Sequence, residues 1–348
     1  MSIQNRISAL ADIGQFFQYA IDAQNEEAHI SSQVENFRAK MKQAEIKNPW
    51  FTQQNIRYSL NQWAKILTKE NLTAWIKNYK PAENPKKIGI IMAGNLPLVG
   101  FHDLISVLLS GHHALVKTSS KDEELMSGVL DFLKNSNDAL NASFTKVERL
   151  KEQRAVIATG SNNTARYFEY YFQGIPAIIR KNRTGVAVLT GEESAEDLHG
   201  LAKDIFLYFG LGCRNVTHLY LSENFETDRL FEAFYDWNEV IHHHKYANNY
   251  EYNRAIYLLS KETFLDNNFV MLKESSDLHC PIGVVHFSRY ENLSLLKQQL
   301  NDKQEEIQCI VSNEPNVFPN SIKFGETQHP NLTDYADGVD VMKFLEAI

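Results

Sequence analysis

Apolar residues recur at two different spacings along the chain, and the change between them divides the sequence. Over residues 1–80 they repeat at helical intervals, which predicts an N-terminal helical segment. A polar, proline-bearing stretch covers residues 80–87. Beyond it, short apolar runs that end in glycine or a small polar residue alternate with amphipathic stretches, as buried strands alternate with helices.

These runs predict an α/β protein. The expected strands cover residues 88–94, 113–119, 154–161, 175–181, 185–191, 216–222, 254–260 and 281–287. The expected helices between them cover residues 97–111, 121–136, 162–172, 192–210 and 224–241. Such alternation gives parallel sheets covered by helices on both faces, with ligands bound outside the carboxyl ends of the strands. The G-x-G-x-x-G fingerprint of standard dinucleotide folds is absent.

Composition and charge narrow the class of protein. The chain has 348 residues and a formal net charge of −8 without a basic stripe, which argues against a nucleic-acid binder. Its start lacks the basic and continuous apolar parts of a signal peptide, and polar residues and a proline interrupt the most apolar run, 88–111. We therefore expect a soluble cytoplasmic protein with no integral membrane segment.

Cysteines and histidines give little reason to expect a metal. The three cysteines are odd in number and widely spaced, which disfavours a disulfide framework or a zinc site. Three consecutive histidines cover residues 242–244, but neighbouring residues of a helix point in different directions and no ligand spacing completes a site. We expect no metal ion.

One cysteine stands in unusual surroundings. Cys213 lies in a glycine turn between an apolar helix and an apolar strand, with Gly210 and Gly212 before it and Arg214 and Asn215 after it. Glycines allow a substrate to approach the backbone closely, and nearby cationic or N–H groups favour the thiolate. This pattern indicates a nucleophile, whereas the alternative is a small buried apolar residue.

Four segments in order resemble the aldehyde dehydrogenase superfamily. They are "IGIIMAGNLPLVGFHDLISVLLSGHHALVKTSS", "IATGSNNTAR", "LYFGLGCRN" and "SSDLHCPIGVVHF", which together span roughly residues 88–290. Within the superfamily, "NPWFTQQNI", "AGNLPLVGFHD", "KNRTGVAVLTG" and "DYADGVDVMKFL" are most similar to the fatty acyl-CoA reductase (LuxC-type) family.

The resemblance implies an aldehyde dehydrogenase-like α/β fold with two Rossmann-like domains and parallel-rich sheets. We expect an N-terminal helical segment over residues 1–80 that packs on a cofactor-binding domain over 81–185. A catalytic domain would follow over 186–312. The tail, 313–348, would dock on the body or on a partner subunit, and the sequence leaves a homo-oligomer open.

The resemblance also assigns catalytic roles. Cys213 would attack the carbonyl carbon of an acyl-CoA and hold the acyl group as a thioester. The side chain of Asn95 and the backbone N–H of Cys213 would stabilise the tetrahedral oxyanion. The alternative for Asn95 is a turn residue that caps the next helix.

Cofactor-binding residues follow from the same comparison. Lys117 would bind the ribose hydroxyls of the cofactor. Ser119 follows it, and Ser120 with Lys121 would accept a 2′-phosphate, where NAD-preferring relatives carry a glutamate at the position of Ser120. NADPH (NADP) is therefore the expected cofactor.

Two further positions complete this expectation. Gly160 and Ser161 open a helix whose N-terminal N–H groups suit phosphate, although a plain helix cap has the same sequence. Asp277 would hold the nicotinamide ribose, with a turn-capping aspartate as the alternative. The basic residues Arg180 and Lys181, with Arg183, could bind a cofactor or CoA phosphate or belong to a solvated surface. We expect the aromatic run 166–172 to be core, with the lining of an acyl groove as the alternative.

One residue of the superfamily pattern is missing. Hydrolytic members carry a glutamate base near the position of Ile179 or Arg180, and neither of these residues can deprotonate water. Glu192 and Glu193 lie nearby in sequence and are the alternative bases. Without a base, the acyl group on Cys213 would persist until hydride transfer, which favours reduction over hydrolysis.

The sequence thus predicts NADPH-dependent reduction of an acyl-CoA thioester to an aldehyde through an acyl-cysteine. The alternatives are a CoA-independent aldehyde dehydrogenase, a cofactor-independent cysteine acyltransferase or thioesterase, and a non-catalytic nucleotide-binding protein on the same scaffold. The sequence does not fix the acyl length or the physiological direction.

Overall fold

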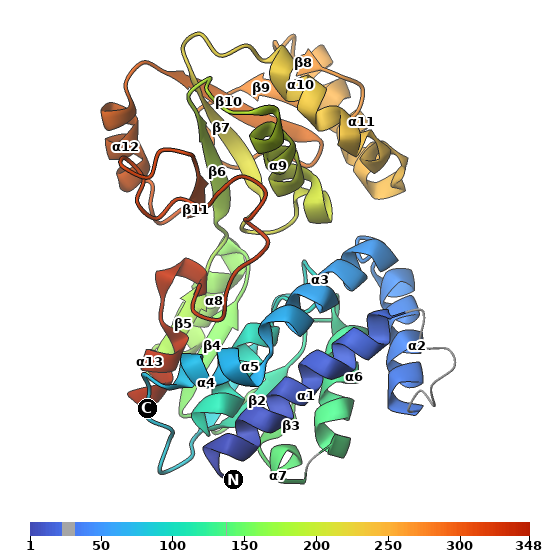
Figure 1. The fold of residues 1–348 in the computed structure, drawn as a ribbon, viewed down its shortest axis with the longest axis vertical. Helices are drawn as coiled ribbons and strands as arrows, with labels where there is room; N and C mark the ends of the chain where they lie inside the picture. Colours follow the sequence, from blue (N-terminus) through green and yellow to red (C-terminus); the bar gives the residue numbers. More distant parts are fainter. Residues whose placement is uncertain (23–31, 137) are drawn as a thin grey trace. The chain divides into compact units, whose positions relative to one another are not determined.

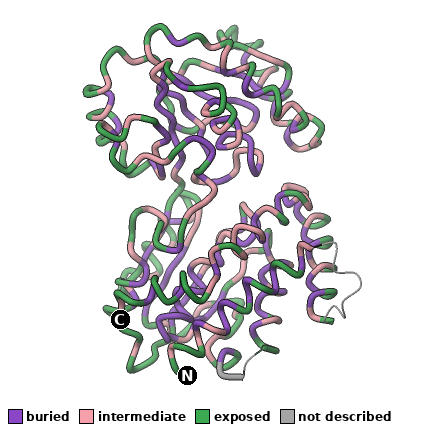
Figure 2. Tube along the Cα trace, viewed as in Figure 1, coloured by how far each residue is buried: buried purple, intermediate pink, exposed green. Residues whose placement is uncertain are grey.

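The computed structural model describes residues 1–22, 32–136 and 138–348, which form two compact units (Figure 1). The first unit contains residues 1–181 together with 331–348, and the second contains residues 182–330. Each unit is built on its own sheet. The strands of both sheets are largely buried (Figure 2).

The first unit has a fully parallel sheet of five strands in the order β3-β2-β1-β4-β5. Their bounds are β1 Lys87–Ile91, β2 His113–Lys117, β3 Phe144–Lys146, β4 Ala155–Thr159 and β5 Ala177–Arg180. The order reverses between β1 and β4, because β2 and β3 extend the sheet on one side and β4 and β5 on the other. Ligands of open α/β sheets bind outside the carboxyl ends at such a reversal.

Helices cover this sheet and fill the rest of the first unit. They are α1 Ile3–Ile21, α2 Ser32–Lys47, α3 Gln53–Ile66, α4 Lys69–Ile76, α5 Phe101–Ser110, α6 Glu123–Ser136, α7 Asp138–Asn141, α8 Asn162–Tyr171 and α13 Val341–Glu346. Leu10, Ile13 and Phe17 recur at helical spacing in α1 and are fully buried, which explains why this segment folds as a helix against the others.

The C-terminal segment is fastened to the first unit by polar contacts. Trp75 Nε1 donates to Tyr335 Oη at 2.7 Å, and Tyr79 Oη donates to Asp340 Oδ2 at 2.9 Å. His112 Nε2 lies 3.0 Å from the carbonyl oxygen of Leu345 in α13. Residues 331–348 therefore belong to the same body as the N-terminal helices.

The second unit has a six-stranded sheet in the order β11-β6-β7-β10-β9-β8, in which only β8 runs antiparallel to its neighbour. Its strands are β6 Thr184–Leu189, β7 Val216–Ser222, β8 Leu265–Asp266, β9 Met271–Glu274, β10 Val284–Tyr290 and β11 Ile307–Val311. Its helices are α9 Ala195–Phe206, α10 Asp228–Phe234, α11 His244–Leu259 and α12 Leu293–Asp302. The expected α/β class with parallel-rich sheets is confirmed.

Two local expectations are wrong. Residues 254–260, expected as a strand, lie largely in α11, where Tyr246, Tyr250 and Tyr257 are buried at helical spacing along one face. The aromatic run 166–172 is not core, because α8 buries only Ala165 and leaves Tyr167, Tyr170 and Tyr171 exposed.

A buried ion pair joins the start of α5 to the end of β5. The Arg180 guanidinium contacts both carboxylate oxygens of Asp103, with Nη1–Oδ2 at 2.6 Å and Nη2–Oδ1 at 2.8 Å. Both side chains are buried. Such a pair contributes little relative to an apolar substitute, but removal of one partner leaves an uncompensated charge in the interior.

We predict that Asp103→Asn lowers the free energy of unfolding by about 3–5 kcal/mol, measured by urea denaturation. Asp103→Leu combined with Arg180→Met removes both charges and should recover much of this loss. The control is Lys87→Met, which breaks the exposed Lys87–Glu152 pair of the same unit and should lower the free energy of unfolding far less. An equal cost for Asp103→Asn and Lys87→Met would contradict the prediction.

Candidate active site

Cys213 lies in a turn between a short 3₁₀ segment, η1 Leu207–Gly210, and the amino end of β7. The side chain is half-buried and takes part in no disulfide. Because β6 and β7 are parallel and Gly185 pairs with Val216, the turn lies at the same edge of the sheet as the start of β6.

The backbone before Cys213 is strained. Tyr208, Phe209 and Gly210 follow one another in the left-handed region, with φ values of 56°, 58° and 75°. Each non-glycine residue in this conformation costs about 1–2 kcal/mol, and such strain persists only where the surroundings impose it. The Phe209 ring packs against His243, with centroids 4.4 Å apart, which helps to hold the turn.

Asn215 closes the turn. Its fully buried side chain accepts a hydrogen bond from the backbone N of Gly212 at 2.8 Å. Its amide group donates to the carbonyl oxygens of three residues at the end of α9 and the start of η1: Asp204 at 3.0 Å, Ile205 at 3.3 Å and Leu207 at 2.8 Å. One side chain thus binds both ends of the strained segment. Sequence reasoning missed this role, because an asparagine near glycines is typical of any turn.

The turn is also fixed against β6. The backbone N of Gly185 donates to the carbonyl oxygen of Asn215 at 2.9 Å. A Cβ atom at position 185 would lie only 2.8 Å from the carbonyl oxygen of Arg214, so this close approach requires glycine.

The other two cysteines differ in their surroundings. The Cys280 thiol donates to the carbonyl oxygen of Val284 at 2.8 Å, and the Cys309 thiol lies 3.7 Å from the carbonyl oxygen of Arg214. Burial raises the pKa of each of these two thiols to about 12. The raised pKa values make Cys280 and Cys309 poor nucleophiles at neutral pH, which leaves Cys213 as the candidate nucleophile.

The segment that carries Asp277 is held on the face of the second sheet. The imidazoles of His218 and His286 approach the carbonyl oxygen of Asp277 through Nδ1 at 2.9 and 3.0 Å, and Thr217 Oγ1 donates to the next carbonyl, of Leu278, at 2.6 Å. The Asp277 side chain is exposed. Burial lowers the pKa of His218 to about 4 and also lowers that of His286, so both rings are neutral.

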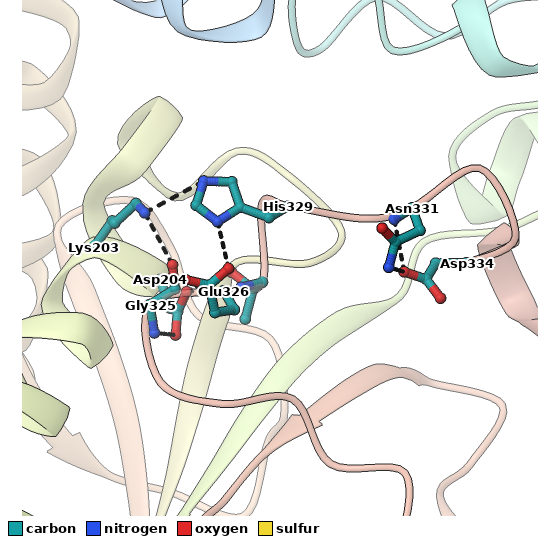
Figure 3. A network of polar contacts seen from close by, with 8 residues as sticks. Lys203, Asp204, Gly325, Glu326, His329, Asn331 and Asp334 are labelled. Atoms are coloured by element: carbon teal, nitrogen blue, oxygen red, sulfur yellow. Dashed lines mark hydrogen bonds and ion pairs between the residues drawn. The ribbon is translucent and has the colours of Figure 1, made fainter. Parts of the chain in front are cut away.

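A carboxylate inside the second unit holds the loop after β11 (Figure 3). Asp204, in α9, accepts from the backbone N of Gly325 at 2.7 Å and from Thr327 N and Oγ1 at 3.1 and 2.8 Å. The neighbouring Lys203 donates to the carbonyl oxygen of Gly325 at 3.0 Å. Burial raises the pKa of Asp204 to about 6 in spite of these donors.

The expected cofactor-binding residues of the first unit follow its strands at the carboxyl edge. Lys117 ends β2, and Ser120 and Lys121 follow it in exposed positions with Ser119 half-buried among them. Gly160 follows β4, and Ser161 is the N-cap of α8, where its Oγ accepts from Thr164 N at 3.2 Å. Exposed polar groups on both sides of the strand-order reversal fit a dinucleotide at this edge.

Asp122 fixes the turn that carries the exposed Asn95. Its Oδ2 accepts from the backbone N of Leu98 at 2.8 Å, and Leu98 has a left-handed φ of 57°. Burial raises the pKa of Asp122 well above its usual range. Among the residues that the structure describes, its Oδ1 has no hydrogen-bond partner. This carboxyl ties the turn after β1 to the segment after β2.

The alternative bases are excluded by their positions. The Glu193 carboxylate is buried and accepts from the backbone N of Thr190 at 2.7 Å and of Gly191 at 3.0 Å, after the carboxyl end of β6. Cys213 precedes the amino end of the parallel strand β7, so about 20 Å of strand separates them. Glu192 is at the same far edge and exposed. The expectation that either could serve Cys213 is wrong.

The residues at the expected base position serve other purposes. Arg180 is paired with Asp103, and Ile179 is an apolar residue of β5. Lys181 forms an ion pair with Glu169 at 2.8 Å, and Arg183 Nη1 donates to the carbonyl oxygen of Gln304 at 3.1 Å. These three basic residues thus have separate protein partners.

Solved structures supply the comparison with known proteins, since no protein-family model matches the sequence and the search of curated proteins gave no match. Aldehyde dehydrogenase 21 from Physcomitrella patens, in complex with the reaction product succinate, is similar with a TM-score of 0.69 at 11% identity, over 100% of this chain and 84% of that chain. The fold is that of the aldehyde dehydrogenases.

Other structures of this fold agree. An NAD-dependent benzaldehyde dehydrogenase from Corynebacterium glutamicum has a TM-score of 0.66 at 10% identity, over 94% of this chain and 83% of that chain. An NAD-dependent aldehyde dehydrogenase from Sinorhizobium meliloti has a TM-score of 0.64 at 11% identity, over 92% and 73%. Likeness at these identities establishes the fold alone. Within the described ranges, no helix is long and apolar enough to cross a membrane.

We predict that Asn215→Ala accelerates amide hydrogen exchange in residues 204–215 and lowers the free energy of unfolding by about 1–3 kcal/mol. The reason is that the buried N–H of Gly212 and the carbonyls at the end of α9 lose their partner. The control is Asn253→Ala, which removes another buried amide, bonded to the carbonyl oxygens of Asn249 and Ile282. Faster exchange around Cys213 in the control, or none in Asn215→Ala, would argue against the assigned role.

A second prediction concerns acid. The pKa of His218 is about 4 in the folded protein against its ordinary value of 6.5 in the unfolded chain, so its contribution to stability is present above pH 6.5 and is lost as the pH falls toward 4. This difference is of order 3 kcal/mol. His218→Asn keeps a donor near the carbonyl of Asp277 but does not titrate, so its unfolding free energy should fall less between pH 7 and 4. His113→Asn, at a half-buried histidine of the first unit, should behave like the wild type, and equal acid sensitivity of all three would refute the argument.

Proposed function

We propose that this protein reduces an acyl-CoA thioester to an aldehyde with NADPH, through an acyl group carried on Cys213. The observation that carries the proposal is the strained turn that holds the half-buried Cys213 and is closed by Asn215, whereas burial raises the pKa of the Cys280 and Cys309 thiols. The fold supports a nicotinamide-dependent reaction, because structures that share it include NAD-dependent dehydrogenases.

In the first half-reaction, the Cys213 thiolate adds to the carbonyl carbon of the thioester. The oxyanion then collapses, the bond to the sulfur of CoA breaks, and CoA leaves with the proton that Cys213 lost. A backbone N–H of the cysteine turn is the donor for the oxyanion within the second unit. Asn95, in the first unit, would be the second donor, as the resemblance to the aldehyde dehydrogenase superfamily implies.

In the second half-reaction, hydride adds to the carbonyl carbon of the acyl-cysteine. The oxyanion collapses again, the carbon–sulfur bond breaks, and the aldehyde leaves while Cys213 returns as a thiolate. Bound NADPH would supply the hydride. Lys117, with Ser119, Ser120 and Lys121, would hold its adenosine ribose, Gly160 and Ser161 its phosphates, and Asp277 its nicotinamide ribose.

Reduction is favoured over hydrolysis because none of the three residues considered as a base, Glu192, Glu193 and Arg180, is available to the acyl-cysteine. Glu193 is buried in its own turn at the far edge of the sheet, Glu192 lies beside it, and Arg180 is paired with Asp103. A positioned base accelerates such a step by about 10²–10⁴. Water therefore attacks the thioester slowly, and the acyl group waits for hydride.

The test is single-turnover mass spectrometry of protein acylated in advance with acyl-CoAs of graded chain length. Without NADPH the acyl group should persist on Cys213 and release free acid slowly. With NADPH it should leave as aldehyde at a rate roughly 10²-fold higher or more, since hydride transfer needs no base.

Matched cysteine variants are the controls. Cys213→Ala should take no acyl label, whereas Cys280→Ala and Cys309→Ala should be labelled like the wild type. Label on Cys213→Ala would remove the nucleophile assignment. Free acid formed as fast as aldehyde would show that a base acts on the acyl-cysteine and that the reaction is hydrolytic.

A further inference from the structure

Lys146 and Glu123 form an ion pair in the first unit, at the carboxyl ends of the neighbouring strands β2 and β3. Lys146 is the last residue of β3, and it pairs in register with Val116 of β2. Its Nζ contacts Oε1 of Glu123, in the first turn of α6, and donates to Ser127 Oγ at 2.9 Å. The other oxygen of Glu123 accepts from Thr118 Oγ1, directly after β2. The pair is therefore attached to the segment that contains Ser119 and Ser120.

Both members of the pair can meet a ligand. The side chains of Lys146 and Glu123 are 44% and 35% exposed. Lys146 and Ser127 line a surface groove between α6 and β3, whose other walls include Phe144 and the charged residues Asp131 and Lys134. The groove offers space beside the ammonium group for a phosphate-sized anion.

The charges of the pair are set by its contacts. Burial alone would raise the pKa of Glu123, but the hydrogen bonds from Lys146, Thr118 and Ser127 outweigh it, so the pKa lies below its usual range. Glu123 is ionised at neutral pH, and its charge offsets that of Lys146. The pair therefore presents one cation and one anion in contact, and Lys134 and Asp131 add one further charge of each sign to the groove.

We propose that the Lys146–Glu123 pair sets the choice between a cofactor with a 2′-phosphate and one with a free 2′-hydroxyl on the adenosine ribose. The proposal rests on the proposed function in one respect, that a nicotinamide dinucleotide is the ligand. The end of the second strand is where parallel dinucleotide-binding sheets read the ribose. A phosphate at that position is attracted by Lys146 and repelled by Glu123, whereas a hydroxyl group can donate to Glu123.

The two residues should therefore have opposite effects on cofactor preference. Lys146→Met removes the cation and should weaken binding of NADPH roughly tenfold or more, with little change for NADH. Glu123→Gln removes the anion, frees Lys146 for the phosphate, and should raise the ratio of NADPH to NADH affinity. Changes of opposite sign in this ratio cannot come from a general loss of folding.

The measurement is the dissociation constant of NADPH and of NADH for the full chain, by titration calorimetry without acyl-CoA. Lys87→Met and Glu152→Gln are the matched controls, since they make the same charge changes in an exposed pair, and Lys87 begins β1 at the amino edge of the same sheet. Both should leave the ratio as in the wild type. Measurable binding with an unchanged ratio in Lys146→Met and Glu123→Gln would overturn this inference alone. Absence of binding of both cofactors by the wild type would overturn the proposed function and this inference with it.

Discussion

The buried amide of Asn215 is the interaction on which the cysteine-bearing unit depends. The chain passes from α9 into β7 through a left-handed turn whose two non-glycine residues, Tyr208 and Phe209, each cost about 1–2 kcal/mol. Asn215 offsets this cost by satisfying the N–H of Gly212 and the carbonyls at the end of α9, each bond contributing about 1 kcal/mol. These hydrogen bonds fix the backbone conformation of the turn that carries the thiol of Cys213.

Strand direction decides which polar groups can act together. Cys213 precedes β7 and Glu193 follows β6, so parallel pairing places them at opposite edges of one sheet although only 20 residues separate them in sequence. In the first unit, parallel pairing brings together turns that are far apart in sequence. The turns after β1, β2 and β4 come from distant parts of the chain, yet they lie at one edge beside the reversal of strand order. The residues proposed to hold a dinucleotide are gathered by the sheet and need few contacts with one another.

Hydrophobic patterning predicted β1, β2, β4, β5, β6, β7 and β10, because these strands bury one or both faces. The expected strand 216–222 coincides with β7, and 113–119 contains β2. Strands β3, β8, β9 and β11 were not predicted. The first three have four residues or fewer, and a glutamine interrupts the apolar run of β11. Residues 254–260 were mistaken for a strand because Ile256 and Leu258 look apolar, whereas both are exposed and the buried face of α11 begins further upstream. The cysteine turn was visible in sequence, but the bonds of Asn215 were not, because they depend on where α9 ends.

Three buried carboxyl groups show how the same side chain serves different purposes. Asp103 meets a guanidinium and forms a full ion pair, which fixes α5 to β5. Asp122 and Asp204 lie against N–H and O–H donors, and burial raises the pKa of each above its usual range. For Asp204, with a folded pKa of about 6 against 3.8, the protonated form is favoured by folding, so its contribution to stability is greatest below pH 3.8 and is lost as the pH rises through 6. Near neutral pH, burial of Asp122 and Asp204 therefore lowers the stability of the folded protein.

The contacts of these two acids explain their presence. Asp122 fixes the turn that carries Asn95, and Asp204 fixes the loop packed on α9, the helix that leads into Cys213. Asp122 and Asp204 each contact a segment next to a proposed catalytic residue. There a carboxyl oxygen accepts hydrogen bonds from backbone N–H groups that an apolar side chain would leave unpaired.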